Sequence, residues 1–116
     1  MQFKLLLALV QDEKVDQVLK AAREAGATGS TVITNARGEG LVRQTTFFGL
    51  DLAAQRDMVL FVVEEHLSRV ILEKIAEAGE FDERPGTGIV IQVAIEDAIG
   101  LSSQIKELRK RVEGEL

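Results

Sequence analysis

The residues best suited to bind an anion lie between Asp82 and Gly88, in a segment that also contains Arg84, Gly86 and Thr87. Two glycines separated by one residue let the backbone turn sharply, and the amides around them can form a concave nest for an anion. The Thr87 hydroxyl and the Arg84 guanidinium would then be further donors. A tight turn leading into a strand explains the same residues without a ligand, and the spacing alone favours that simpler interpretation.

The only histidine, His66, directly follows Glu64 and Glu65. An imidazole beside two carboxylates could act as a general acid or base, or bind a metal weakly. One imidazole without any cysteine makes a tetrahedral zinc site a poor fit. Carboxylates are also common at the beginning of a helix, where the helix dipole favours them, and the sequence favours this interpretation. The chain has no Walker loop, dinucleotide fingerprint or nucleophile–base pattern, so we do not expect an enzyme.

A long connection spans residues 35–56, between two apolar segments. Connections of this length are commonly functional or disordered. Gly38 and Gly40 lie near its beginning, and Phe47 and Phe48 lie in its second half. These two aromatic side chains either pack back onto the body of the protein or insert into a partner.

Composition excludes several classes of function. The 116 residues are enough for one domain, and a formal net charge of −5 disfavours nucleic acid as a partner. Basic residues near the C-terminus alternate with glutamates, as on a solvated helix. The absence of cysteine excludes disulfides and thiolate metal sites. The apolar run Phe3–Val10 is too short for a signal peptide or a membrane span, which predicts a cytoplasmic protein.

Two helices that would position these residues are copies of each other. Val18–Gly26 aligns with Ile71–Gly79 at a constant offset of 53 residues. Asp12 is expected to cap the first helix, and Gly26 and Gly79 are expected to end the two helices in the left-handed region. In both copies apolar residues recur three and four apart, which places them on one helical face: Val15, Val18, Leu19, Ala22 and Ala25 in the first, and Leu67, Ile71, Ile75 and Ala78 in the second.

Short apolar runs rich in β-branched residues flank each helix and predict strands: Phe3–Val10, Ser30–Thr34, Met58–Val63 and Ile89–Ile95. The resulting order is βαββαβ, the ferredoxin-like α+β fold. It consists of a four-stranded antiparallel sheet with two helices on one face. A C-terminal helix is expected over residues 102–114, capped by Ser102 or Ser103.

The other face of this sheet would be uncovered, yet it is apolar. The last strand alternates strongly apolar residues with small or polar ones, and the first strand is apolar on both faces. Packing against further copies of the chain would bury this surface. We therefore expect an oligomer.

At the two glycine-bearing segments the chain resembles the PII signal-transduction family, in a divergent PII-like branch. The resemblance covers roughly Phe3–Leu101 and is carried by Ala27-Thr28-Gly29-Ser30-Thr31-Val32, Gly38-Glu39-Gly40, Arg43-Gln44, Phe61-Val62-Val63 and Gly86-Thr87-Gly88-Ile89. It implies a homotrimer that binds adenine nucleotides in clefts between subunits. It also implies a T-loop, here residues 38–56, that contacts target proteins such as transporters or metabolic enzymes, and a B-loop at residues 82–88.

The resemblance also implies site residues. Thr31 would lie near the adenine, Gly38 and Gly40 at the base of the T-loop, and Gly86 and Gly88 beside the phosphates. Arg43 and Gln44 match the Arg-Gln pair of the family, and together with Phe47 and Phe48 they would form the partner-binding loop. With Arg84 and Thr87 added as donors, this completes the ligand site.

Two departures from the family predict a weak effector site with no tightly bound cofactor. Ile89 stands where the family has a lysine, and Asp97-Ala98-Ile99-Gly100 replaces a stretch with arginines. Charge-assisted hydrogen bonds contribute strongly to phosphate binding. Three functions therefore remain open: a PII-like regulator that binds AMP, ADP or ATP, a structural or adaptor trimer without a ligand, and a small ferredoxin-like enzyme that uses His66.

Overall fold

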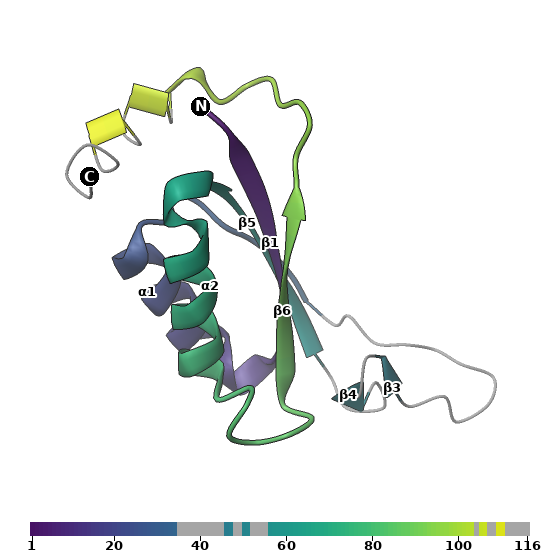
Figure 1. The fold of residues 1–116 in the computed structure, drawn as a ribbon. Helices are drawn as coiled ribbons and strands as arrows, with labels where there is room; N and C mark the ends of the chain where they lie inside the picture. Colours follow the sequence, from purple (N-terminus) through teal and green to yellow (C-terminus); the bar gives the residue numbers. More distant parts are fainter. Residues whose placement is uncertain (35–45, 48–49, 52–55, 104, 107–108, 111–116) are drawn as a thin grey trace.

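The computed structural model describes residues 1–34, 46–47, 50–51, 56–103, 105–106 and 109–110. Its core is a four-stranded antiparallel sheet in the order β2-β5-β1-β6, with two helices packed on one face (Figure 1). The elements are β1 (Phe3–Gln11), a 3-10 turn (Asp12–Lys14), α1 (Val15–Ala25), β2 (Thr31–Ile33), β5 (Arg56–Glu64), α2 (Glu65–Gly79) and β6 (Gly88–Ala94). This is the predicted βαββαβ arrangement.

Two further short strands, β3 (Thr46–Phe47) and β4 (Leu50–Asp51), pair as a separate ribbon. The rest of the predicted long loop, including Gly38, Gly40, Arg43, Gln44 and Phe48, lies outside the described residues. None of the helices described is long and apolar enough to cross a membrane.

The duplication seen in the sequence is also present in the core. Val18 and Ala22 of α1 are fully buried, and so are their counterparts Ile71 and Ile75 in α2. The same offset of 53 residues relates the strand residues that face the helices. These are Leu6, Ala8 and Val10 of β1, and Val59, Phe61 and Val63 of β5, all buried. Burial of these apolar side chains between the sheet and the helices is the main contribution to stability.

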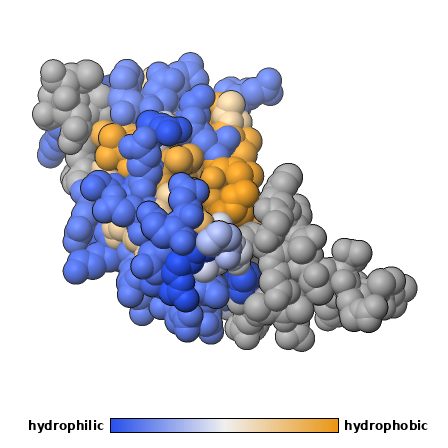
Figure 2. Space-filling view, turned by 60° about the horizontal axis from the view of Figure 1, so that its bottom comes forward, coloured by the Kyte–Doolittle hydropathy of each residue, from blue (hydrophilic) through white to orange (hydrophobic). Residues whose placement is uncertain are grey.

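The opposite face of the sheet carries a second apolar layer. The register pairs Leu7 of β1 with Leu60 of β5 on one side and with Ile91 of β6 on the other. The complete layer consists of Leu5, Leu7, Leu9, Met58, Leu60, Val62, Ile89, Ile91 and Val93. Ile91 and Val93 are exposed, and Figure 2 shows a hydrophobic patch on the surface bordered by polar residues. We call these nine residues the open face.

Three local predictions need correction or stay open. Asp12 does not cap α1, because it lies inside the 3-10 turn and the helix begins after Lys14 without a side-chain cap. Gly26 ends α1 with a φ of 124°, but the left-handed residue after α2 is Glu80, with a φ of 57°, and not Gly79. The C-terminal helix stays a prediction, since only part of residues 102–114 is described.

Candidate functional site

The predicted anion segment forms a turn that is closed by its own hydrogen bonds. The Thr87 hydroxyl donates to the carbonyl oxygen of Arg84 at 2.8 Å, and the Thr87 amide donates to the same oxygen at 3.2 Å. The Arg84 amide donates to the carbonyl of Glu80 at 3.0 Å. Gly86 is in the left-handed region with a φ of 84°. In this conformation the Thr87 donors serve the turn, as the simpler interpretation of the sequence requires.

Gly88 has a packing reason to be glycine. A Cβ atom built at this position would overlap the ring of Phe81 and come within 2.7 Å of the carbonyl oxygen of Leu9. A Cβ at Gly79 would meet the same ring. The close approach of Phe81 to both glycines could not be inferred from a Gly-x-Gly spacing, because it depends on how the turn folds back over the sheet.

Arg84 lies in an ion-pair network on the outer side of the turn. Its Nη1 atom is 3.6 Å from the Oε2 atom of Glu80, and the Nζ atom of Lys14 is 3.0 Å from the same oxygen. The hydrogen bond from Lys14 and its charge, followed by the charge of Arg84, lower the pKa of Glu80 below its usual value of 4.5. The sequence did not single out Lys14 or Glu80, since they are far apart along the chain.

Arg56 holds the turn from its inner side. It begins β5, its side chain is buried, and its Nη2 atom donates to the carbonyl oxygen of Gly86 at 2.9 Å. From the sequence this residue is only the end of the long loop, with no role of its own. A charged residue at the start of an apolar run was the one signal that could have drawn attention to it.

Thr31 borders a hollow on the open face, at the other edge of the sheet. The hollow has a volume of about 370 Å³ and is lined by Leu5, Gly29, Ser30, Thr31, Leu60, Val62 and Leu101. Its floor is aliphatic. Its polar rim consists of Gly29, Ser30 and Thr31, which lead into β2. Within the described part of the chain β2 is an edge strand, so its outer side has no partner strand. A flat, largely apolar ring with polar edges fits this chemistry.

The two parts of the predicted ligand site do not meet within one chain. Thr31 lies in β2 and Gly88 in β6, the two edge strands, with β5 and β1 between them. Three strand spacings separate these edges by roughly 14 Å. Of the other predicted residues, Gly38, Gly40, Arg43, Gln44 and Phe48 lie outside the described residues, and Phe47 is placed in β3 by its backbone alone.

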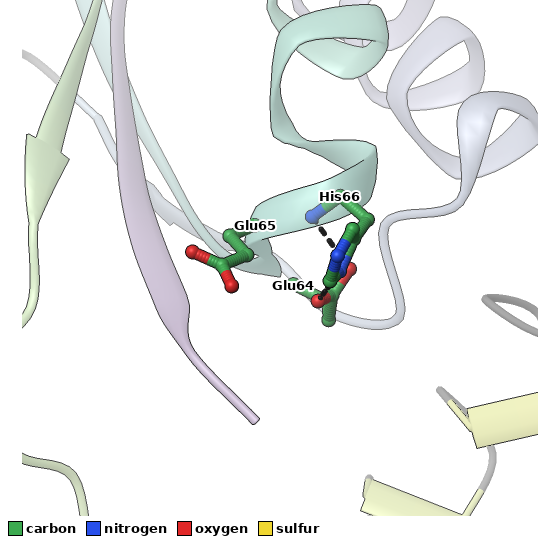
Figure 3. Close-up of side chains that lie close together, drawn as sticks. All are labelled: Glu64, Glu65 and His66. Carbon is green, nitrogen blue, oxygen red and sulfur yellow. Dashed lines mark hydrogen bonds and ion pairs between the residues drawn. The ribbon is translucent and has the colours of Figure 1, made fainter.

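His66 belongs to a helix cap. Glu64 precedes α2, and its buried carboxylate accepts a hydrogen bond from the His66 amide at 2.7 Å and contacts the His66 Nδ1 atom at 2.5 Å (Figure 3). This hydrogen bond and the charge of Glu64 raise the pKa of His66 above 6.5. Ligand atoms of Glu64, Glu65 and His66 lie within 4.8 Å of one another. Glu65 points away from the other two side chains in Figure 3, whereas Glu64 and His66 contact each other.

Comparison with known proteins agrees with this architecture. The sequence matches the family of the nitrogen regulatory protein P-II over residues 3–104, most of the chain. The chain belongs to the P-II family. Proteins of the P-II family are signal-transduction regulators and not enzymes.

A solved structure shares the fold of this P-II protein. It is CPII from Thiomonas intermedia K12, bound to ADP, AMP and acetate, with a TM-score of 0.63 and 19% sequence identity. The similarity covers 84% of this chain and 90% of CPII. Among curated proteins, none matches the sequence.

Proposed function

We propose that this P-II protein is a homotrimeric regulator that binds an adenine nucleotide weakly in clefts between its subunits. The observation that carries this proposal is the position of the two half-sites on opposite edges of one sheet. A second copy that placed its β2 edge beside the Gly86 turn of the first would complete a cleft. One side would offer an aliphatic hollow for the base, and the other a glycine turn with Arg84 for the phosphates.

The open face supports self-association as the way to form this cleft. Its nine apolar residues run across three strands, and Ile91 and Val93 are exposed in the single chain. Burial of such a surface against identical copies is strongly favourable. The CPII structure, a protein of the same fold, contains ADP and AMP, which makes adenine nucleotides the first ligands to test.

Native mass spectrometry tests the assembly. The wild-type protein should have three times the mass of the chain, and Ile91→Lys should dissociate it because a charge would enter the apolar interface. Val70→Lys is the matched control, since Val70 is also an exposed aliphatic residue but lies on α2. A monomeric wild-type protein, or equal effects of the two variants, would refute the proposed trimer.

Calorimetry with AMP, ADP and ATP tests the ligand. We expect weak binding that Arg84→Met reduces, because the variant removes a cation from the turn. Arg69→Met is the control, since Arg69 forms an exposed ion pair with Glu73 on α2. Heat from none of the three nucleotides would contradict the proposal.

We further propose that residues 38–56 form the partner-binding loop, with Arg43, Gln44, Phe47 and Phe48 as contacts. The partner would be a membrane transporter or a metabolic enzyme, as the resemblance implies. The wild-type trimer should capture such a protein in a nucleotide-dependent manner. Replacing Phe47 and Phe48 by alanine should abolish capture and leave the trimer mass unchanged. Equal capture by the variant would refute this role.

The second candidate is an adaptor trimer without a ligand. It is favoured by the closed turn, in which the Thr87 donors are already used and Arg84 pairs with Glu80. In that case the trimer and its partner binding would persist, but no nucleotide would produce heat.

A further inference from the structure

Two cations from different parts of the chain meet at one carboxylate oxygen beside the Gly86 turn. Lys14 comes from the end of the 3-10 turn and Arg84 from the turn after α2, and both contact the Oε2 atom of Glu80. The Lys14 side chain is largely buried, whereas that of Arg84 is mostly exposed. Lys14 and Arg84 therefore stabilise a negatively charged oxygen between them, and this oxygen belongs to Glu80.

The backbone of Glu80 is unusual for its residue type. It has a φ of 57°, and no other non-glycine residue among those described has a positive φ. The residue that caps the end of α1 is Gly26, and glycine adopts a positive φ without a steric penalty. Strain of this kind is often retained where a side chain has a role. The carboxylate of Glu80 is such a side chain, because it is the group that brings Lys14 and Arg84 together.

Glu80 also ties this ion-pair network to the turn itself. Its carbonyl oxygen accepts a hydrogen bond from the Arg84 amide at 3.0 Å and lies 3.3 Å from the Thr87 hydroxyl. A displacement of the Glu80 carboxylate would free the Arg84 guanidinium, while the Thr87 hydroxyl would keep its hydrogen bond to the Arg84 carbonyl at 2.8 Å. Arg84 and Lys14 are the two donors that the Glu80 carboxylate withholds from a ligand.

We propose that Lys14 and Arg84 form a subsite for the terminal phosphate of a bound nucleotide, and that the carboxylate of Glu80 occupies this subsite as an internal competitor until the phosphate displaces it. This inference rests on the proposed nucleotide-binding function and adds Lys14 to its site. Lys14 supplies a positive charge close to the turn. Ile89, which stands where the family has a lysine, cannot supply one.

Charge supports a competition of this kind. The two cations lower the pKa of Glu80, which means that they favour a negative charge at this point. A phosphate carries more negative charge than one carboxylate and accepts more hydrogen bonds, so it can replace Glu80 on both cations. Asp82 and Glu83 on the same turn are exposed and would oppose any anion. Their effect would be weak, since solvent and salt screen exposed charges.

The test compares two substitutions that each remove one negative charge from the same turn. Glu80→Gln should tighten ADP binding about three- to tenfold, because it removes the competitor and leaves both cations. Asp82→Asn is the matched control, since Asp82 forms no ion pair within the described part of the chain. It should change the affinity by less than about twofold. Lys14→Met should weaken ADP binding, whereas Lys74→Met, which removes an exposed lysine of α2, should not.

A double variant adds a test of the contact itself. If Glu80 competes by occupying Lys14, then the gain from Glu80→Gln should shrink in the Lys14→Met background. Equal effects of Glu80→Gln and Asp82→Asn would overturn the proposal, because they would show a general charge effect. An unchanged gain in the double variant would overturn it as well.

Titration with inorganic pyrophosphate separates this inference from the proposed function. If ADP binds to the wild type but Glu80→Gln does not bind it more tightly, the subsite is wrong and nucleotide binding stands. If ADP does not bind but Glu80→Gln binds pyrophosphate more tightly than the wild type, the competition between Glu80 and an anion stands, and the nucleotide as its ligand is wrong. If neither protein binds ADP or pyrophosphate, both proposals are wrong.

Discussion

The two βαβ halves of this protein end their helices with the same hydrogen bonds but with different residues. After α1 the Ala27 amide donates to the carbonyl of Ala22 at 2.9 Å, and after α2 the Phe81 amide donates to the carbonyl of Ala76 at 3.1 Å. The residue with a positive φ that directly follows the helix is Gly26 in the first half and Glu80 in the second. The helix end has therefore kept its hydrogen bonds but comes one residue later in the second half, since Gly79, the counterpart of Gly26 at the offset of 53 residues, still lies in α2.

The halves differ most in the segment that joins each helix end to the next strand. Four residues, 27–30, lead from the first helix end to β2, whereas the second half needs residues 81–87 to reach β6. The additional residues form the glycine turn, with Arg56 on its inner side and Glu80 on its outer side. The proposed ligand chemistry was therefore added at one helix end of a symmetric scaffold. Substitutions at the turn after α2 should therefore have larger effects than matched substitutions elsewhere in the chain.

The largest difference is expected between Gly88→Ala and Gly29→Ala. A Cβ at Gly88 would overlap Phe81 and approach the Leu9 carbonyl, whereas a Cβ at Gly29 would meet no atom within 4 Å. Overpacking in a close-packed region should lower the free energy of unfolding by about 3 kcal/mol for Gly88→Ala. Gly29→Ala should be close to neutral. Urea denaturation measures both values, and similar losses would show that the turn after α2 is not packed as described.

Arg56→Met tests the inner side of the turn. The variant keeps much of the aliphatic volume but removes the donor to the Gly86 carbonyl, and we expect a loss of about 2 kcal/mol in the free energy of unfolding. Arg69→Met, on the exposed surface of α2, should have little effect. Hydrogen exchange of the turn amides should accelerate in Arg56→Met alone. Unchanged exchange at residues 84–88 would mean that Arg56 does not hold the turn.

The left-handed residues provide a smaller contrast. Gly26→Ala would force a side chain into a φ of 124° and should lower the free energy of unfolding by about 1–2 kcal/mol. Glu80→Gly relieves the strained backbone but loses the ion pairs with Lys14 and Arg84, so the two effects should largely offset each other. Thermal unfolding compares the two variants. A larger loss for Glu80→Gly than for Gly26→Ala would show that the ion pairs outweigh the strain.

The smallest expected effect is a dependence of the stability on pH, which arises from His66 in the second half. Glu64 raises the pKa of His66 above 6.5, so protonated His66 is favoured in the folded state. Its contribution is fully present below pH 6.5 and is lost as the pH rises through the higher pKa of the folded state. The unfolding midpoint of the wild type should therefore fall, relative to that of His66→Gln, between about pH 6 and 8. Parallel curves would contradict a charged His66–Glu64 pair.

Much of the fold could be predicted from the sequence because periodicity is a local property. Residues three and four apart placed Val18 and Ile71 on buried helix faces, and alternation separated the strongly apolar residues of the last strand from its small or polar ones. The offset of 53 residues predicted two βαβ units, and the same offset holds for the buried residues of β1 and β5. Short-range steric choices at helix ends were less predictable: Asp12 resembles a cap but lies in a 3-10 turn, and Gly79 is glycine because of Phe81.

The candidate site was only half predictable. The sequence singled out Arg84, Gly86 and Thr87 by their types, but it could not assign Arg56, Lys14 or Glu80 to the same turn. Lys14 and Glu80 are 66 residues apart, and Arg56 and Gly86 are 30 apart. No spacing rule connects residues so distant along the chain.

By itself the sequence determined the two βαβ units, their shared helix face and an apolar sheet face that remains to be covered, because these features depend on the order of side chains along each element. The tertiary structure decided which residues meet at the glycine turn and that Thr31 and Gly88 lie on opposite edges of the sheet. Those contacts depend on strand order, register and packing. These are set by the whole core at once and not by any one segment.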